Sequence, residues 1–144
     1  MTTFHFGDIS VTRIEESLHP VFDPFKFLPD YDPDLVAPHM VWFAPNHFDP
    51  QSGRLVVSMH SWLVRTAQHT ILIDTCVGDH THMPGLPAYH MQQFPYLENL
   101  AAAGVQPEEI DYVLCTHLHS DHVGWHTRLV DGRHVPTFPN ARYV

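Results

Sequence analysis

The stretch His117–His122 constrains the fold more than any other part of this sequence. It places three histidines and one aspartate within six residues. It comes after a short apolar run, Tyr112–Cys115, which is typical of a buried strand. A rigid strand with a polar loop at its end is well suited to hold a functional site. The stretch therefore predicts a site at the carboxyl end of this strand.

The side chains of this stretch are of the kinds that bind zinc and its first-row neighbours. His117 and His119 point the same way in extended backbone, so they can bind one ion. Asp121 and His122 fall where the chain must bend, and they can face a second ion. Two ions about 3.5–4 Å apart can share a hydroxide and polarise the bond that it attacks. The spacing predicts a two-metal hydrolytic site, for which these ligands are about half of the set; the alternative is a polar loop with adjacent histidines in a chain that has 14 of them.

Composition limits the class of protein. At 144 residues the chain is one domain, or part of a larger one, and 44 % hydrophobic residues exclude a disordered chain. A formal net charge of −9 argues against nucleic acid or an anionic membrane as a partner. We see no signal peptide and no apolar run near the roughly 20 residues that span a bilayer. Two cysteines, Cys76 and Cys115, are too few for a disulfide framework, so we expect reduced thiols and a cytoplasmic protein.

Alternating and apolar segments predict the sheet. Phe4–Phe6 and Ile9–Ile14 are typical of an N-terminal hairpin. Leu55–Arg65 and Thr70–Asp74 form the strongest strand pair, and the apolar run Ile71–Ile73 predicts a strand covered on both faces.

Further elements follow along the chain. The 3- and 4-residue spacing of apolar side chains predicts a helix over Tyr89–Ala103, with Pro95 as an alternative start. Pro107–Ile110 indicates a short turn, and Val130–Arg133 a tight hairpin turn. Arg142–Val144 is typical of a strand end.

Residues 20–50 differ from the rest. Seven prolines and seven aromatic residues alternate there. Proline blocks regular elements, and so many aromatics are unusual in a solvated linker. We expect a long ordered arm within a single domain of residues 1–144, with one helical turn near Asp34–Ala37. The arm is either a functional cover or a plain packing segment.

Asp74 is a further candidate site residue because it ends a strand, as the histidine cluster does. If the two strands are neighbours, the Asp74 carboxylate can accept the free ring N–H of a ligand histidine and orient it. The alternative is a turn or capping aspartate. No serine has a nucleophile-elbow pattern, and no glycine-rich phosphate loop is present. We interpret the isolated histidines as surface or core residues: His60, His69, His80, His82, His90, His126 and His134.

On these residues the chain resembles the metallo-β-lactamase-fold hydrolases. Their hallmark H-x-H-x-D-H after a buried strand is complete here, and Thr116 and Gly124 match its longer form. Ile71–Thr75 is similar to the earlier family strand that ends in Asp and is usually followed by Thr-Gly, although Cys76 replaces that glycine. Residues 20–50 resemble the N-terminal extension of the lactonase and organophosphate-hydrolase-like branch. The matching motif residues are His117, His119, Asp121 and His122.

The resemblance implies an α/β fold, an αββα sandwich of two similar halves with mixed sheets, flanking helices and metals in the cleft between the sheets. It implies two zinc ions in a complete site, with iron, manganese or cobalt as alternatives, and a catalytic role for Asp121 besides metal ligation. The substrate would be a small lactone, ester or phosphotriester, attacked by metal-bound hydroxide. The family's later ligands, a His, a bridging Asp and a final His, have no counterpart here in matching order. The chain therefore resembles an N-terminal half.

Two hypotheses about function follow. The first is a metal-dependent hydrolase of this superfamily whose isolated 144-residue chain is inactive. The second is a non-catalytic half-domain that binds metal weakly, or that associates with a partner or with a second copy as a homodimer. Half of a sandwich exposes an apolar sheet face and unpaired edges, which favours association.

Overall fold

The computed structural model describes residues 2–144. These residues form two compact units. The first contains the chain up to Glu16 together with Met59–Val144, and the second contains Ser17–Ser58. Two long strands, β2 (Ile9–Phe22) and β4 (Arg54–Arg65), have residues in both units.

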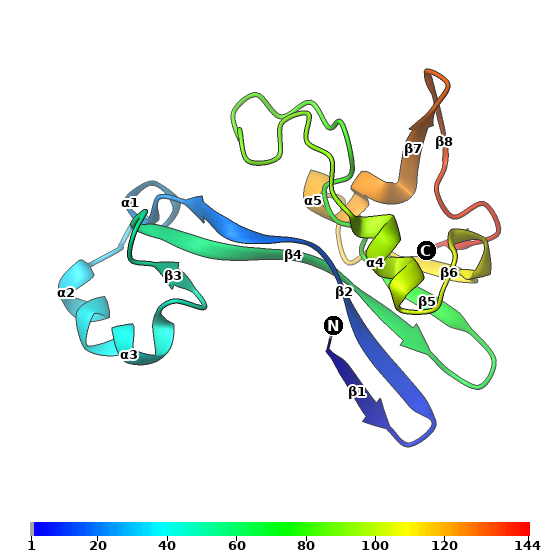
Figure 1. The fold of residues 1–144 in the computed structure, drawn as a ribbon, viewed down its shortest axis with the longest axis horizontal. Helices are drawn as coiled ribbons and strands as arrows, with labels where there is room; N and C mark the ends of the chain where they lie inside the picture. The colour runs from blue at the N-terminus through cyan, green and yellow to red at the C-terminus, as the bar shows by residue number, and fades with distance from the viewer. Residues whose placement is uncertain (1) are drawn as a thin grey trace. The chain divides into compact units, whose positions relative to one another are not determined.

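The main sheet is mixed, with the strand order β1-β2-β4-β5-β6-β9 and β3 paired to β4. Figure 1 labels these strands except β9. The predicted N-terminal hairpin is confirmed by the antiparallel pair of β1 and β2, and the second strand pair by β4 and β5. β5, β6 and β9 run parallel, so their carboxyl ends meet at the same edge of the sheet. The shorter strands are β1 (Thr3–Phe6), β3 (Phe48–Asp49), β5 (Thr70–Ile73), β6 (Tyr112–Leu114) and β9 (Arg142–Tyr143).

The core of the first unit lies between this sheet and the helix α4 (Tyr96–Ala102). Leu63, Leu72 and Val113 of the sheet are buried with Tyr96 and Leu100 of the helix. Burial of such side chains stabilises the fold by about 1.5–3 kcal/mol each.

The predicted helix over Tyr89–Ala103 is wrong in its first half, because α4 begins only after Pro95. Proline disfavours the helical conformation of the residue before it, so the helix cannot extend back through Phe94. The preceding segment is irregular, although Tyr89 within it is fully buried.

The predicted burial of β5 on both faces is also wrong. Leu72 is buried, but Ile71 and Ile73 on the opposite face remain partly exposed. Adjacent side chains of a strand point to opposite faces, and α4 covers the face of Leu72. The continuous apolar run of β5 therefore has only one fully buried side within residues 2–144.

A separate hairpin follows the histidine cluster. β7 (Thr127–Val130) and β8 (Arg133–Pro136) pair antiparallel, as the turn pattern predicted. Asp131 and Gly132 both have positive φ, 50° and 75°, which is the geometry of a two-residue type I′ turn. Short helical turns elsewhere in this unit are η2 (Pro107–Glu109), α5 (Ser120–Val123) and η3 (Gly124–His126).

The second unit contains short helical turns between the parts of β2 and β4 that belong to it. The turn expected near Asp34–Ala37 is present as α2 (Pro33–Val36). The structure adds further turns that the proline content had argued against, because Pro24 and Pro33 sit at first helical positions, where no N–H is needed. The added turns are α1 (Pro24–Phe27), η1 (Ala37–His39) and α3 (Met40–Phe43). Over residues 2–144, every helix is too short or too polar to cross a membrane.

Candidate functional site

The histidine cluster lies at the carboxyl end of β6. Strand β6 ends at Leu114, and the chain then runs exposed to His119, which is the N-terminal cap position of α5. Asp121 and His122 belong to the single turn of α5. The extended segment and the helical turn thus place the two predicted pairs on different local backbones, as the spacing indicated.

The structure brings the four motif side chains together. His117 Nε2 lies 3.1 Å from His119 Nδ1, and the His117 and His122 ring centroids are 3.9 Å apart. His122 Nε2 lies 3.5 Å from Asp121 Oδ2. Three imidazoles and one carboxylate therefore form one contiguous group that is accessible from solvent.

Asp74 joins this group from the neighbouring strand. Its Oδ2 lies 2.9 Å from His122 Nδ1, since β5 and β6 are adjacent and parallel. A carboxylate only accepts hydrogen bonds, so His122 Nδ1 carries the proton and Nε2 keeps its lone pair in the neutral ring. Partial burial alone would raise the pKa of Asp74, but hydrogen bonds from Thr116 and His122 outweigh it and lower the pKa below its ordinary value.

Thr116 is a site residue whose role the sequence interpretation missed. Its amide donates to Asp74 Oδ1 at 2.8 Å, and its hydroxyl donates to Asp74 Oδ2 at 2.8 Å. The same hydroxyl lies 3.2 Å from His117 Nδ1 and 3.3 Å from His122 Nδ1. One hydroxyl therefore links the aspartate to two of the histidines. Its only signal in the sequence was its place directly before the motif.

The donor set suits a divalent metal in kind but not in number. Zinc and its neighbours take about three protein donors each, from imidazole and carboxylate groups among others. Within residues 2–144, no three His, Cys, Asp or Glu side chains are arranged to hold one ion. The closest side-chain contacts within the cluster join His117 to His119, His117 to His122, and His122 to Asp121.

Cys76, where the resemblance implies glycine, lies two residues after Asp74 in the loop that follows β5. Its φ is 50°, a left-handed conformation that favours glycine, and its side chain is buried. The thiol lies 3.4 Å from the Ser61 hydroxyl, and burial raises the pKa of Cys76 far above its ordinary value. The Cys76 thiol is thus a packed, protonated group.

A hollow of about 450 Å³ opens beside His117. Its walls are mainly apolar and include Val113, Leu118 and Tyr143. The isolated histidines lie outside the cluster; His80, for example, contacts Gln93 at 3.1 Å, and His90 Nδ1 accepts from the Met83 amide.

The fold is an α/β arrangement of a mixed sheet with flanking helices, and comparison with known proteins identifies its family. The model of the metallo-beta-lactamase superfamily matches residues 55–144. The chain belongs to this superfamily, and it has the superfamily's hydrolase fold.

Solved structures agree with this assignment. The chain is 29 % identical to the hydrolase AbOPH of the beta lactamase superfamily, with a TM-score of 0.72 over 98 % of this chain and 42 % of that one. A probable metal-dependent hydrolase from Staphylococcus aureus is 22 % identical, with a TM-score of 0.70 over 97 % and 47 %. AidC, a dizinc quorum-quenching lactonase, is 19 % identical, with a TM-score of 0.73 over 99 % and 43 %.

The chain therefore spans less than half the length of each of these proteins. No curated protein sequence matches it.

Proposed function

We propose that the cluster of His117, His119, Asp121 and His122 supplies half of the ligands of a dinuclear metal site in a hydrolase of small esters, lactones or phosphotriesters. The observation that carries the proposal is the convergence of these side chains with Asp74 at the ends of two adjacent parallel strands. Such a convergence of imidazole and carboxylate groups at strand ends is typical of a site built on rigid elements.

The spacing of the motif suggests how the ligands divide between two ions. His117 and His119 would hold one ion, and Asp121 and His122 the other. Bound divalent ions would supply Lewis acidity and a water molecule of lowered pKa. Zinc is the expected metal, with iron, manganese or cobalt as alternatives.

The chain's own residues around the ligands act on orientation. Asp74 accepts the Nδ1 proton of His122 and so leaves the Nε2 atom of that ring, 3.5 Å from Asp121 Oδ2, free to bind an ion. Thr116 fixes the Asp74 carboxylate through its amide and its hydroxyl. Asp121 is the residue of the cluster to which we assign a catalytic role beside metal binding.

The substrate class is inferred from chemistry and likeness. The apolar hollow beside His117 suits the hydrocarbon part of an ester or lactone. AidC was solved with the product N-hexnoyl-L-homoserine, and AbOPH is named a hydrolase, so a small acyl compound is the first class to test.

The isolated 144-residue chain is expected to turn over such substrates hardly at all, because each ion would have two protein donors where about three are needed. The test is hydrolysis of a p-nitrophenyl ester, an acyl-homoserine lactone and a phosphotriester by purified chain loaded with zinc, with His119→Ala as the control. Turnover that His119→Ala abolishes would contradict the inactivity. Zinc binding that is the same in the parent and in His119→Ala would contradict the metal site.

A non-catalytic, self-associating role is the second candidate, and one observation favours it. Ile71 and Ile73 lie in register with Tyr112 and Leu114 of β6, and these four side chains are partly exposed on the sheet face opposite to α4. Unpaired edges and apolar faces of this kind favour association of two copies. Light scattering after size exclusion tests it: a homodimer supports this candidate, and a monomer at 100 µM (about a hundredfold above a micromolar Kd) contradicts it.

A further inference from the structure

Glu16 is a buried carboxylate far from the histidine cluster in sequence. It lies on β2, and only 3 % of its surface is exposed. Its Oε2 accepts from the Val77 amide at 3.1 Å, and its Oε1 accepts from the Gly78 amide at 2.8 Å and from the Trp125 indole N–H at 2.7 Å. A carboxylate is costly to bury without hydrogen-bond donors, so these three bonds hold the Glu16 side chain in its buried position.

The segments that Glu16 joins are the two that frame the cluster. Val77 and Gly78 continue the loop that Asp74 begins after β5, and Trp125 follows α5, which carries Asp121 and His122. Backbone hydrogen bonds connect the same two segments. The Thr75 amide donates to the His122 carbonyl at 2.8 Å, and the Gly124 amide donates to the Cys76 carbonyl at 2.8 Å. The Trp125 amide donates to the Thr75 carbonyl at 2.9 Å.

The packing at this junction leaves little room for adjustment. A Cβ atom on Gly124 would lie 1.8 Å from the Val77 carbonyl oxygen, and one on Gly78 would lie 2.7 Å from Gly124. The Trp125 ring stacks on the Tyr96 ring of α4, with centroids 5.2 Å apart. Loss of the Glu16 acceptor would therefore leave buried N–H groups without a partner, because the backbone cannot turn them toward water.

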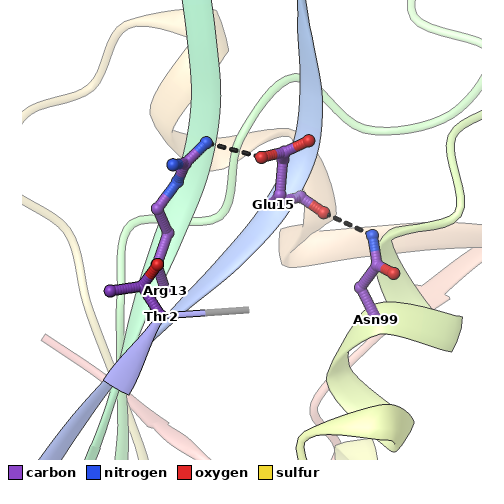
Figure 2. A pocket seen from close by; sticks show the side chains of 4 residues that line it. All are labelled: Thr2, Arg13, Glu15 and Asn99. Atoms are coloured by element: carbon purple, nitrogen blue, oxygen red, sulfur yellow. Dashed lines mark hydrogen bonds and ion pairs between the residues drawn. The ribbon is translucent and has the colours of Figure 1, made fainter. Parts of the chain in front are cut away.

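The neighbouring Glu15 lies on the opposite face of β2 and makes none of the contacts described for Glu16. Glu15 pairs with Arg13 at the rim of a small polar pocket, and its backbone oxygen accepts from Asn99 (Figure 2). Adjacent strand residues point to opposite faces, so two glutamates in sequence have different surroundings. Glu15 is a matched control for any change at Glu16.

We infer that Glu16 is a positioning residue for the metal centre: its carboxylate fixes the loop that carries Asp74 to the helical turn that carries Asp121 and His122. The inference rests on the proposed function. Glu16 does not touch the four ligands, and it acts through Gly78 and Trp125. Replacement by glutamine turns one acceptor oxygen into an NH₂ group that faces N–H donors, with almost no change in size.

The experiment compares Glu16→Gln, Glu15→Gln and Trp125→Phe in the 144-residue chain. Zinc affinity is measured by competition with a chromophoric chelator, and backbone amide resonances of the metal-free chain are recorded by NMR. We expect Glu16→Gln to weaken zinc binding by up to about tenfold, the lower end of the loss seen when a group bonded directly to a metal ligand is removed, because Glu16 acts on the ligands only through Gly78 and Trp125. Glu15→Gln should stay within about twofold of the parent, and Trp125→Phe, which removes one of the three donors, should fall between.

The amide resonances of the metal-free chain test the role of Glu16 independently of metal binding. If the parent chain binds no zinc, the proposed metal site is overturned, and the amides of Asp121 and His122 then decide the role of Glu16. Shifts of these amides in Glu16→Gln but not in Glu15→Gln support positioning; unchanged amides, or zinc affinity within twofold of the parent, overturn it. If Glu16→Gln does not fold, Trp125→Phe is judged by the same two measurements.

Discussion

Two loops leave the same edge of the sheet, after the adjacent strands β5 and β6, and they differ in almost every property. In the loop after β5, Thr75, Cys76 and Val77 are at most 1 % exposed, and their backbone groups are bound to α5, to η3 and to Glu16. In the loop after β6, residues 116–119 are exposed. Their polar side chains contact one another and Asp74.

The two loops have different roles: the loop after β5 supports the site, and the loop after β6 carries most of its candidate ligands. The buried loop contributes one side chain, Asp74, to the cluster and otherwise fixes backbones in place. The side chains of the exposed loop make few packing contacts, so the stability of the fold does not constrain which residues stand there. Changes in the first loop should therefore alter stability, and changes in the second should alter binding while the fold remains.

The largest effect is expected at the contact between the buried loop and η3. Gly124→Ala would drive a methyl group into the Val77 carbonyl, so the free energy of unfolding should fall by about 3 kcal/mol, the upper end of the usual cost of overpacking. Gly85→Ala is the control, since nothing lies within 4 Å of a Cβ there. Urea unfolding of both variants measures the difference; equal stability would mean that the loop after β5 is not rigidly packed against η3.

The two cysteines sharpen the comparison, because each loop contains one. Burial raises the pKa of Cys76, whereas Cys115 is only partly buried and donates to the His117 carbonyl. The thiolate is the reactive form. Cys115 should therefore react with a disulfide reagent on the order of a hundredfold faster than Cys76 at pH 8. Cys115→Ser should remove the fast phase; a fast phase that remains in this variant would contradict the burial of the β5 loop.

The pH dependence of stability tests the support beneath the buried loop. Desolvation by burial raises the pKa of Glu16 above 4.5, in spite of its hydrogen bonds from Gly78, Val77 and Trp125, and the nearby Asp79 raises it further. A carboxyl with a raised pKa in the folded chain binds its proton more tightly there than in the unfolded chain. Its contribution to stability is thus complete below pH 4.5 and is lost as the pH rises through the folded value.

Unfolding by urea at several pH values between 4 and 7 measures this. Relative to Glu16→Gln, the parent should lose stability as the pH increases over this range, while Glu15→Gln should follow the parent. Parallel curves for the parent and Glu16→Gln would show that Glu16 is not desolvated by the loop.

The smallest effect on stability is expected in the exposed loop. His119→Ala removes a side chain that contacts mainly His117, so the free energy of unfolding should change by no more than about 0.5 kcal/mol. Thermal unfolding without metal checks this. A much larger loss would show that the cluster is part of the structural core and would remove the contrast between the loops.

The sequence was sufficient for the parts of the site that are local. The cluster follows its strand within a few residues. Asp74 was a candidate only on the condition that its strand neighbours that of the cluster, and the parallel pairing of β5 and β6 in the structure meets that condition. The correct start of α4 could be predicted from the sequence only as an alternative. The helical spacing of apolar residues continues on both sides of Pro95, whereas the helical backbone cannot extend through the residue before a proline.

Glu16 could not be found from the sequence. A charged residue in an N-terminal strand is ordinarily exposed, and two adjacent glutamates give no indication of which one points inward. Its donors are a loop amide pair and an indole that belong to distant segments. Only the tertiary fold brings them to one carboxylate.

The hydrogen bond between Glu16 and Trp125 joins residues that are 109 positions apart in the chain. Contacts of such separation form slowly, because the entropy of closing a long loop must be overcome first. During synthesis, the residues of β2 are added long before Trp125. We therefore expect the contact of Glu16 with Trp125 to be among the last contacts of the site to form, after the segments of Asp74, Asp121 and His122 have all been synthesised.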